Sequence, residues 1–213
     1  MTSARLRVML VDDHAIVRSG FRRLLERYPT IEVVAEADTG EQAYRHFVEH
    51  APDVTVLDLS MPDTGGLEIL RRLLAREAAA KVIVFSMHAD AALADRAMRL
   101  GARGYVSKSN APDVLAHAVL EVAAGKIFLS PDIALALAQF KLAGEDDPLK
   151  QLTAREFEIF QQIVAGQTAN EIAGTLNLSA KTVANYHTLI KQKLNVGTDV
   201  ELMRLAMRHN LLG

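Results

Sequence analysis

The strongest constraint on the fold is a regular alternation of short β-branched runs and longer amphipathic segments over residues 7–124. Short apolar runs are typical of buried strands, whereas apolar residues three and four apart are typical of helices. Such alternation favours a parallel sheet whose right-handed crossovers place helices on both faces. We therefore predict a flavodoxin-like, doubly wound α/β fold with five strands and five helices. The strands are expected at 7–11, 32–35, 54–57, 81–85 and 104–106, and the helices at 16–28, 41–49, 67–76, 93–100 and 112–124.

The pattern changes at residue 149, beyond which the chain reads as helical throughout. Thr153-Ala154-Arg155-Glu156 fits a capping box, in which a hydroxyl and a carboxylate satisfy free amide donors at a helix start. That helix is expected to reach residue 165, and others are expected at 169–176, 180–193 and 199–210. We predict an α/β domain at 1–125, a linker with a helix at 126–148, and an all-α four-helix domain at 149–213.

Composition restricts the kinds of metal site and the cellular location that we expect for the protein. The 213 residues contain no cysteine, which excludes disulfides and thiolate metal sites but leaves oxygen-ligand cation sites open. No apolar stretch approaches the roughly 20 residues needed to span a bilayer, and the apolar residues before Asp12 are too few for a secretory signal. We therefore expect a cytoplasmic protein without a membrane partner.

Charge is divided unevenly along the chain. Residues 1–147 hold 17 Lys and Arg against 21 Asp and Glu, whereas residues 148–213 hold 7 against 5. An acidic half can concentrate a cation, and a mildly basic half can approach nucleic acid. The imbalance is small, so it supports these expectations only weakly.

Polar side chains stand at the ends of four expected strands: Asp12, Asp13, Asp58, Ser86 and Lys108. Residues just past the carboxyl ends of parallel strands converge on one crevice, so these side chains are expected to meet. Crowding of three carboxylates is unfavourable, and Mg²⁺, which prefers carboxylates, carbonyls and water, resolves it. The pattern predicts a Mg²⁺ site that accepts a phosphoryl group on an aspartate, with Lys108 as a fixed positive charge and Ser86 as a hydroxyl donor.

Residues 7–124 resemble the receiver domain of bacterial response regulators, through the motifs Val11-Asp12-Asp13-His14, Asp58-Leu59-Ser60-Met61-Pro62, Gly65-Gly66, Ser86 and Lys108. The resemblance implies that Asp58 accepts phosphate from the phosphohistidine of a histidine kinase. It implies that Asp13, Asp58 and the backbone carbonyl of Ser60 ligate Mg²⁺, while Asp12 holds a coordinating water. Ser86 and Tyr105 are the implied switch pair, the hydroxyl moving toward the phosphoryl group and the ring following inward.

One position departs from the receiver pattern. Many receivers follow the lysine with proline, whereas Lys108 here precedes Ser109. A cis peptide bond before a residue other than proline costs roughly 3–4 kcal/mol. The loop is therefore expected either to stay trans or to lie where its surroundings offset this cost.

Residues 171–194 have the spacing of a helix-turn-helix. This motif needs a small residue where its helices cross, a turn residue that tolerates left-handed geometry, and an apolar anchor on the second helix. Ala173, Asn177 and Val183 supply these, and Ser179 can cap the second helix. The buried face of that helix is expected to comprise Val183, Tyr186, Ile190 and Leu194.

The opposite face of the second helix is expected to enter a DNA major groove. Asn185 and Gln192 suit two-point pairing with adenine, while lysines and His187 suit phosphates. The alternative is a helical protein-interaction domain with a solvated polar face. The predicted DNA contacts are Lys181, Thr182, Ala184, Asn185, His187, Thr188, Lys191, Gln192 and Lys193.

Residues 149–210 resemble the LuxR-type DNA-binding domain, through Leu152–Glu156, Glu171-Ile172-Ala173, Leu178–Val183 and Lys193-Leu194. Many relatives carry lysine where Ala184 stands, so one expected DNA contact is missing. A receiver joined to this domain resembles the NarL/FixJ class of response regulators. The resemblance implies a transcription factor controlled by a sensor histidine kinase, binding promoter DNA and forming a homodimer on phosphorylation or on DNA.

Three other functions remain open from the residues. A phosphatase with an aspartyl nucleophile commonly has an acid two residues later, where this chain has Ser60. An FMN-binding flavodoxin-like protein needs a phosphate loop after the first strand, where Asp12 and Asp13 would repel phosphate. A DNA-binding protein indifferent to phosphorylation is the most serious rival. The preferred function is a phosphorylation switch rather than a turnover enzyme.

Overall fold

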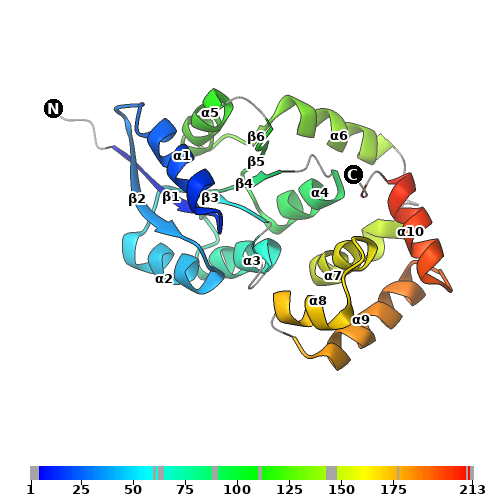
Figure 1. Cartoon of the computed structure of the whole chain (residues 1–213). Coiled ribbons are helices and arrows are strands. Elements are labelled where there is room, and N and C mark those ends of the chain that lie inside the picture. Colours follow the sequence, from blue (N-terminus) through cyan, green and yellow to red (C-terminus); the bar gives the residue numbers. More distant parts are fainter. Residues whose placement is uncertain are drawn as a thin grey trace. The chain divides into compact units, whose positions relative to one another are not determined.

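The computed structural model describes residues 5–59, 61, 65–87, 91–109, 112–142, 148–176, 178–209 and 211. The chain divides into two compact units, residues 1–137 and 138–213, and each is considered by itself (Figure 1). Among the described residues, no helix combines the length and apolar character needed to cross a bilayer.

The first unit is built on the strands β1 (Leu6–Val11), β2 (Ile31–Ala37), β3 (Val54–Leu57), β4 (Val82–Ser86), β5 (Gly104–Ser107) and β6 (Phe128–Leu129). Within the described residues they form one sheet in the order β2-β1-β3-β4-β5-β6, and the pairings are parallel. The predicted parallel α/β class is confirmed. The sixth strand was not predicted, because two residues are too few for a periodic pattern.

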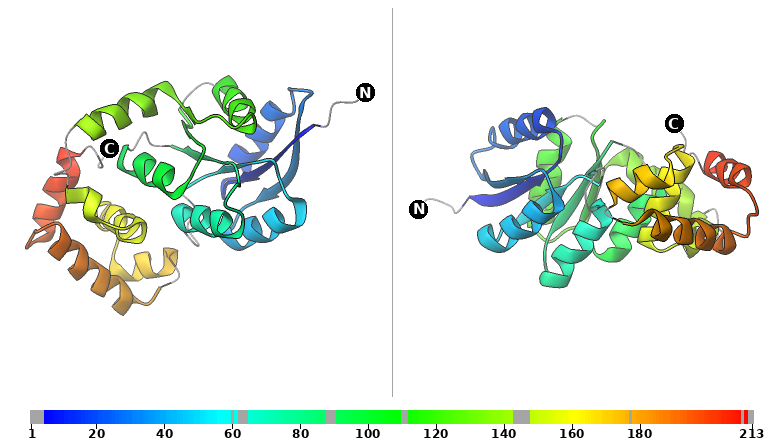
Figure 2. Two further views of the ribbon diagram at one scale, coloured as in Figure 1. Left: turned by 180° about the vertical axis from the view of Figure 1, so that it is seen from behind. Right: turned by 60° about the horizontal axis from the view of Figure 1, so that its bottom comes forward.

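Helices of the first unit are α1 (Ala15–Leu25), α2 (Gly40–His50), α3 (Gly66–Arg76), α4 (Ala91–Leu100) and α5 (Pro112–Ala123). Figures 1 and 2 show α1 and α5 over one face of the sheet and α2, α3 and α4 over the other. The helix that follows β6, α6 (Pro131–Leu142), contains the boundary between the two units.

The central strands are buried between these layers. All four residues of β3 are buried, and Val8 of β1 and Ile83 of β4 are fully enclosed. Leu115 and Val119 of α5 join them in the core. Near-continuous Val, Ile and Leu runs are typical of parallel strands covered on both faces. Polar groups therefore gather where the apolar runs stop, at the strand ends.

The second unit is helical and contains α7 (Ala154–Val164), α8 (Ala169–Thr175), α9 (Ala180–Lys193) and α10 (Asp199–Arg208), preceded by the 3₁₀ turn η1 (Pro148–Gln151). The predicted all-helical C-terminal domain is confirmed. Its core includes Phe157, Phe160 and Leu202, which are fully buried.

Capping explains where three of these helices begin. The predicted capping box is present at Thr153 and Glu156. Two further boxes, at Thr168 with Glu171 and at Thr198 with Glu201, start α8 and α10. Each satisfies backbone donors that a helix start leaves without intrahelical partners.

Candidate functional site

The pairing of β1 with β3 brings the acidic residues together. Val11 lies opposite Leu57 in the parallel register, so the residues that follow the two strands are neighbours. The amide of Asp58 donates to the Val11 carbonyl at 2.8 Å, which extends the pairing by one residue past β3. The side chains of Asp12 and Asp58 consequently start from adjacent points of the backbone.

Lys108 joins these two carboxylates. Its ammonium donates to Asp12 Oδ2 and to Asp58 Oδ2, both at 2.7 Å. The side chains of Lys108 and Asp58 are 4% and 1% exposed, so water screens these ion pairs little. The peptide bond from Lys108 to Ser109 is trans, which settles the open question about this loop. Lys108 therefore reaches the two carboxylates although no proline follows it, as one does in many receivers.

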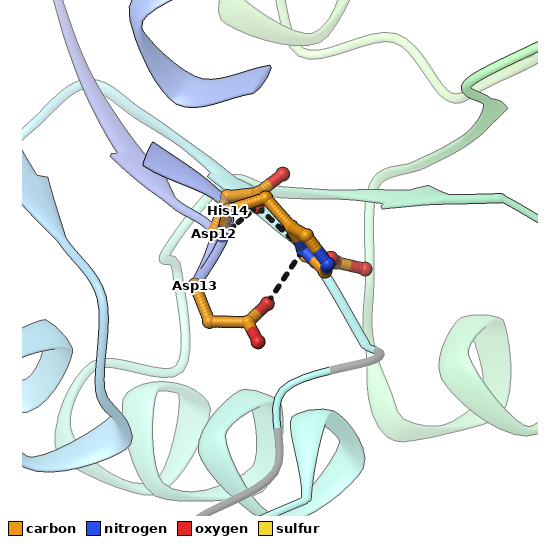
Figure 3. Close-up of side chains that lie close together, drawn as sticks. Asp12, Asp13 and His14 are labelled. Atoms are coloured by element: carbon orange, nitrogen blue, oxygen red, sulfur yellow. Dashed lines mark hydrogen bonds and ion pairs between the residues drawn. The ribbon is translucent and has the colours of Figure 1, made fainter. Parts of the chain in front are cut away.

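Asp13 and His14 complete the cluster, as Figure 3 shows. One ligand atom from each of Asp12, Asp13, His14 and Asp58 lies within 4.8 Å of the others. His14 Nδ1 is 3.0 Å from Asp13 Oδ1 and 3.4 Å from Asp12 Oδ1. His14 was not among the predicted site residues, although its place directly after two aspartates at a strand end was a usable signal.

The residues fit a divalent cation. Three carboxylates against one ammonium leave two negative charges in excess. Asp13 Oδ1 is buried and, among the described residues, accepts no hydrogen bond. Excess negative charge and a buried carboxylate oxygen that accepts no hydrogen bond are the conditions that a hard cation relieves. The cluster is therefore a candidate cation site.

The implied switch pair lies close to the acidic cluster along the sheet. Ser86 is the last residue of β4, is buried, and its carbonyl accepts from the Lys108 amide at 2.7 Å. Tyr105 lies in β5 and is fully buried. Ser60, whose carbonyl was expected to serve as a ligand, lies outside the described residues.

Helix α9 presents two distinct faces in the second unit. Val183, Ile190 and Leu194 are buried as expected, and Tyr186 is half-buried. The expected outward residues, Ala184, Asn185, Thr188 and Gln192, are all exposed. Ala173 of α8 is buried, while Asn177 of the predicted turn lies outside the described residues.

Lys193 has a partner in α7. Its ammonium donates to Glu156 Oε2 at 2.7 Å, and the side chain of Glu156 is 4% exposed. Burial raises the pKa of Glu156, but hydrogen bonds from Lys193 and from the Thr153 backbone outweigh it and hold this pKa below its usual value. Lys193 thus contributes to packing of the unit as well as to its positive charge.

Asp199 pairs with two other basic side chains of α9. Its Oδ1 is 2.8 Å from His187 Nε2 and 3.1 Å from Lys191 Nζ. Burial raises the pKa of Asp199, whereas Lys191 and His187 lower it further than burial raises it. An open hollow of about 480 Å³ lies beside this group, lined by His187, Thr188, Lys191, Gln192, Asn195, Val196 and Gly197. Asp199 was not singled out in the sequence.

A parallel α/β unit with an acidic cluster bridged by lysine, joined to a helix-turn-helix, defines a phosphoacceptor switch coupled to a DNA-binding module. The chain matches the family model described as "Response regulator receiver domain" over residues 8–120 and the model "Bacterial regulatory proteins, luxR family" over residues 150–206. It therefore belongs to the two-component response regulators with a LuxR-type DNA-binding domain. Members of this family are phospho-accepting signalling proteins rather than turnover enzymes.

Relatives share this domain arrangement. The chain is 42% identical to the response regulator UvrY of Escherichia coli over 208 residues, which cover 97% of this chain and 95% of UvrY. A LuxR-family response regulator from Aurantimonas is 45% identical, with a TM-score of 0.63, over 65% of this chain and 99% of that structure. RcsB of Salmonella enterica, solved bound to promoter P1flhDC with the phosphomimetic BeF₃⁻, is 26% identical, with a TM-score of 0.73, over 94% of this chain and 98% of that structure.

Proposed function

We propose that Asp58 accepts a phosphoryl group from the phosphohistidine of a sensor histidine kinase, and that this modification switches promoter binding. The observation that carries the proposal is the contact of Lys108 with both Asp58 and Asp12 at the paired strand ends. A buried ammonium beside the acceptor carboxylate can compensate the charge of an incoming phosphoryl group.

In this proposal the phosphorus–nitrogen bond of the kinase's phosphohistidine breaks as a phosphorus–oxygen bond forms at a carboxylate oxygen of Asp58. Lys108 then pairs with a phosphoryl oxygen in place of the Asp58 oxygen that it holds. Ser86 donates its hydroxyl to another phosphoryl oxygen. In the proposed switch the ring of Tyr105, which is fully buried in β5, follows the Ser86 hydroxyl inward.

The proposed cofactor is Mg²⁺, held by Asp13, Asp58 and the backbone carbonyl of Ser60, with Asp12 holding a coordinating water. Support comes from the two excess negative charges and from the buried Asp13 oxygen that accepts no hydrogen bond among the described residues. When bound, the cation supplies neutralisation of charge on the phosphoryl oxygens.

The proposed DNA interface is the exposed face of α9. Asn185 and Gln192 are proposed to read bases, with Ala184 and Thr188 beside them, since all four are exposed on one face. The proposed phosphate contacts are Lys181, Thr182, His187, Lys191 and Lys193. RcsB, whose structure was solved bound to a promoter, supports DNA binding by this unit.

The proposal also includes a homodimer and a cytoplasmic location. Its domain boundaries are 1–125, 126–148 and 149–213. Support for a dimer comes from RcsB, solved as two dimers on two parallel DNAs. The compact units divide at 137/138, because β6 and the start of α6 belong to the first unit.

The decisive experiment compares Asp58→Asn with a matched control, Asp38→Asn. Asp38 also directly follows a parallel strand, β2, but its side chain is exposed and outside the cluster. DNA footprinting with and without a small-molecule phosphodonor should show phosphodonor-dependent protection for wild type and Asp38→Asn, and none for Asp58→Asn. Equal protection of wild type with and without phosphodonor would establish a constitutive DNA-binding protein instead.

A further inference from the structure

His14 occupies a helix-start position without serving as a cap. It precedes α1 with extended backbone angles, and its side chain makes no capping hydrogen bond. Helix starts favour Ser, Thr, Asp or Asn because their oxygens accept from free amides, a role that a histidine fills poorly. The imidazole is instead directed at the acidic cluster (Figure 3).

A backbone hydrogen bond fixes the turn that carries His14. The His14 amide donates to Asp12 Oδ1 at 2.7 Å, so the carboxylate and the ring belong to one tight turn after β1. The ring remains 61% exposed on its outer side. A cation entering from solvent therefore meets the imidazole together with the carboxylates.

The spacing suits a single cation. In an octahedral shell with bonds of roughly 2.1 Å, adjacent ligand atoms are about 3 Å apart and opposite ones about 4 Å. Asp13 Oδ1 and His14 Nδ1 are separated by 3.0 Å, as adjacent ligands are. All four ligand atoms of the cluster fall within 4.8 Å of one another.

An imidazole changes which cation the site prefers. Mg²⁺ favours carboxylates, carbonyls and water, whereas Co²⁺, Ni²⁺ and Zn²⁺ gain from nitrogen ligands. We propose that His14 is a ligand for borderline divalent transition cations at the acidic cluster, so that the site binds these ions through nitrogen and Mg²⁺ through oxygen alone. The inference rests on the proposed cation site, and it makes His14 the residue that determines cation preference there.

The test measures Ni²⁺ and Mg²⁺ affinity of the untagged full chain by isothermal titration calorimetry, for wild type and His14→Gln. Ni²⁺ affinity should fall by about tenfold or more, since even loss of an outer-shell partner costs metal sites roughly 10–100-fold. Mg²⁺ affinity should stay within about twofold of wild type. The visible absorption of bound Co²⁺ should lose its nitrogen-ligand contribution in the same variant.

Two matched control variants replace other histidines that also lie beside a carboxylate. His117 is 64% exposed, with Nε2 at 3.9 Å from Glu121, and His187 Nε2 is 2.8 Å from Asp199. His117→Ala and His187→Ala should leave Ni²⁺ affinity at the cluster unchanged.

Other outcomes distinguish an error in the role of His14 from an error in the proposed cation site. If His14→Gln leaves Ni²⁺ affinity intact, or lowers Ni²⁺ and Mg²⁺ equally, the inference is overturned while the cation site stands. If Asp13→Asn and Asp58→Asn leave Mg²⁺ affinity intact, the proposed cation site itself fails.

Discussion

The ammonium of Lys193 lies 2.7 Å from Glu156 Oε2, which ties the last turn of α9 to the capping box that starts α7. Glu156 thereby accepts from a backbone amide and from a lysine at once. Lys193, a residue predicted to contact DNA, thus also fixes the C-terminal end of α9 against the core of its unit.

Lys193→Ala should destabilise the helical unit by about 1–3 kcal/mol, because it leaves a buried carboxylate with fewer partners. Urea unfolding measures the change in the free energy of unfolding. Hydrogen exchange of the α7 amides shows whether the loss of stability is located at this helix. Lys191→Ala is the matched control, since its partner Asp199 is solvent-exposed and such pairs contribute little. Equal destabilisation by the two variants would contradict the assigned role of the Glu156 pair.

The helical unit should lose stability in acid. Backbone hydrogen bonds from Thr168 and from Gly197 lower the pKa of Glu171 and of Glu201, and the pKa of Glu156 is lowered as well. Groups with a depressed folded-state pKa stabilise the fold above their unfolded value and lose that contribution as the pH falls through the folded value. Urea midpoints should therefore be level near neutrality and decline below the ordinary value of 4.5. In Glu156→Gln this decline should be shallower.

Asp199→Asn should increase affinity for DNA of random sequence. The substitution removes a negative charge that competes with DNA phosphates for Lys191 and His187. The slope of log affinity against log salt should steepen by roughly one to two, at about 0.9 per phosphate contact. Fluorescence anisotropy over a salt series measures this, with Asp199→Glu as the charge-preserving control. Weaker binding by Asp199→Asn would show that Asp199 positions the two cations instead.

Gly66→Ala should disturb the segment after Asp58. A Cβ at Gly66 would collide with Leu59 Cα and lie 2.7 Å from Leu59 Cδ2, so the backbone next to Asp58 must shift. Gly20→Ala, inside α1 with nothing within 4 Å of the added carbon, should instead stabilise by about 0.5–1 kcal/mol. Thermal unfolding and Mg²⁺ titration of the two variants test this, and a neutral Gly66→Ala would mean that the Leu59 segment yields freely.

Local patterns were sufficient for most elements. The predicted 54–57 strand and 180–193 helix coincide with β3 and α9, because apolar periodicity and flanking caps are properties of a few neighbouring residues. Likewise, the positions of Asp12, Asp58 and Lys108 after expected strands were sufficient to predict that they lie together. The short strand β6 left no such pattern, since its two residues become a strand only by pairing with β5.

By itself, the order of residues determined the element types, the two-part organisation and the polar residues at each strand end, because those depend on short-range periodicity and on capping. Only the tertiary structure decided that Val11 pairs with Leu57, that Lys108 contacts Asp12 and Asp58 at once, and that Lys193 pairs with Glu156, 37 residues before it. Those contacts depend on strand order, register and helix packing, which join segments whose separation in sequence carries no local signal.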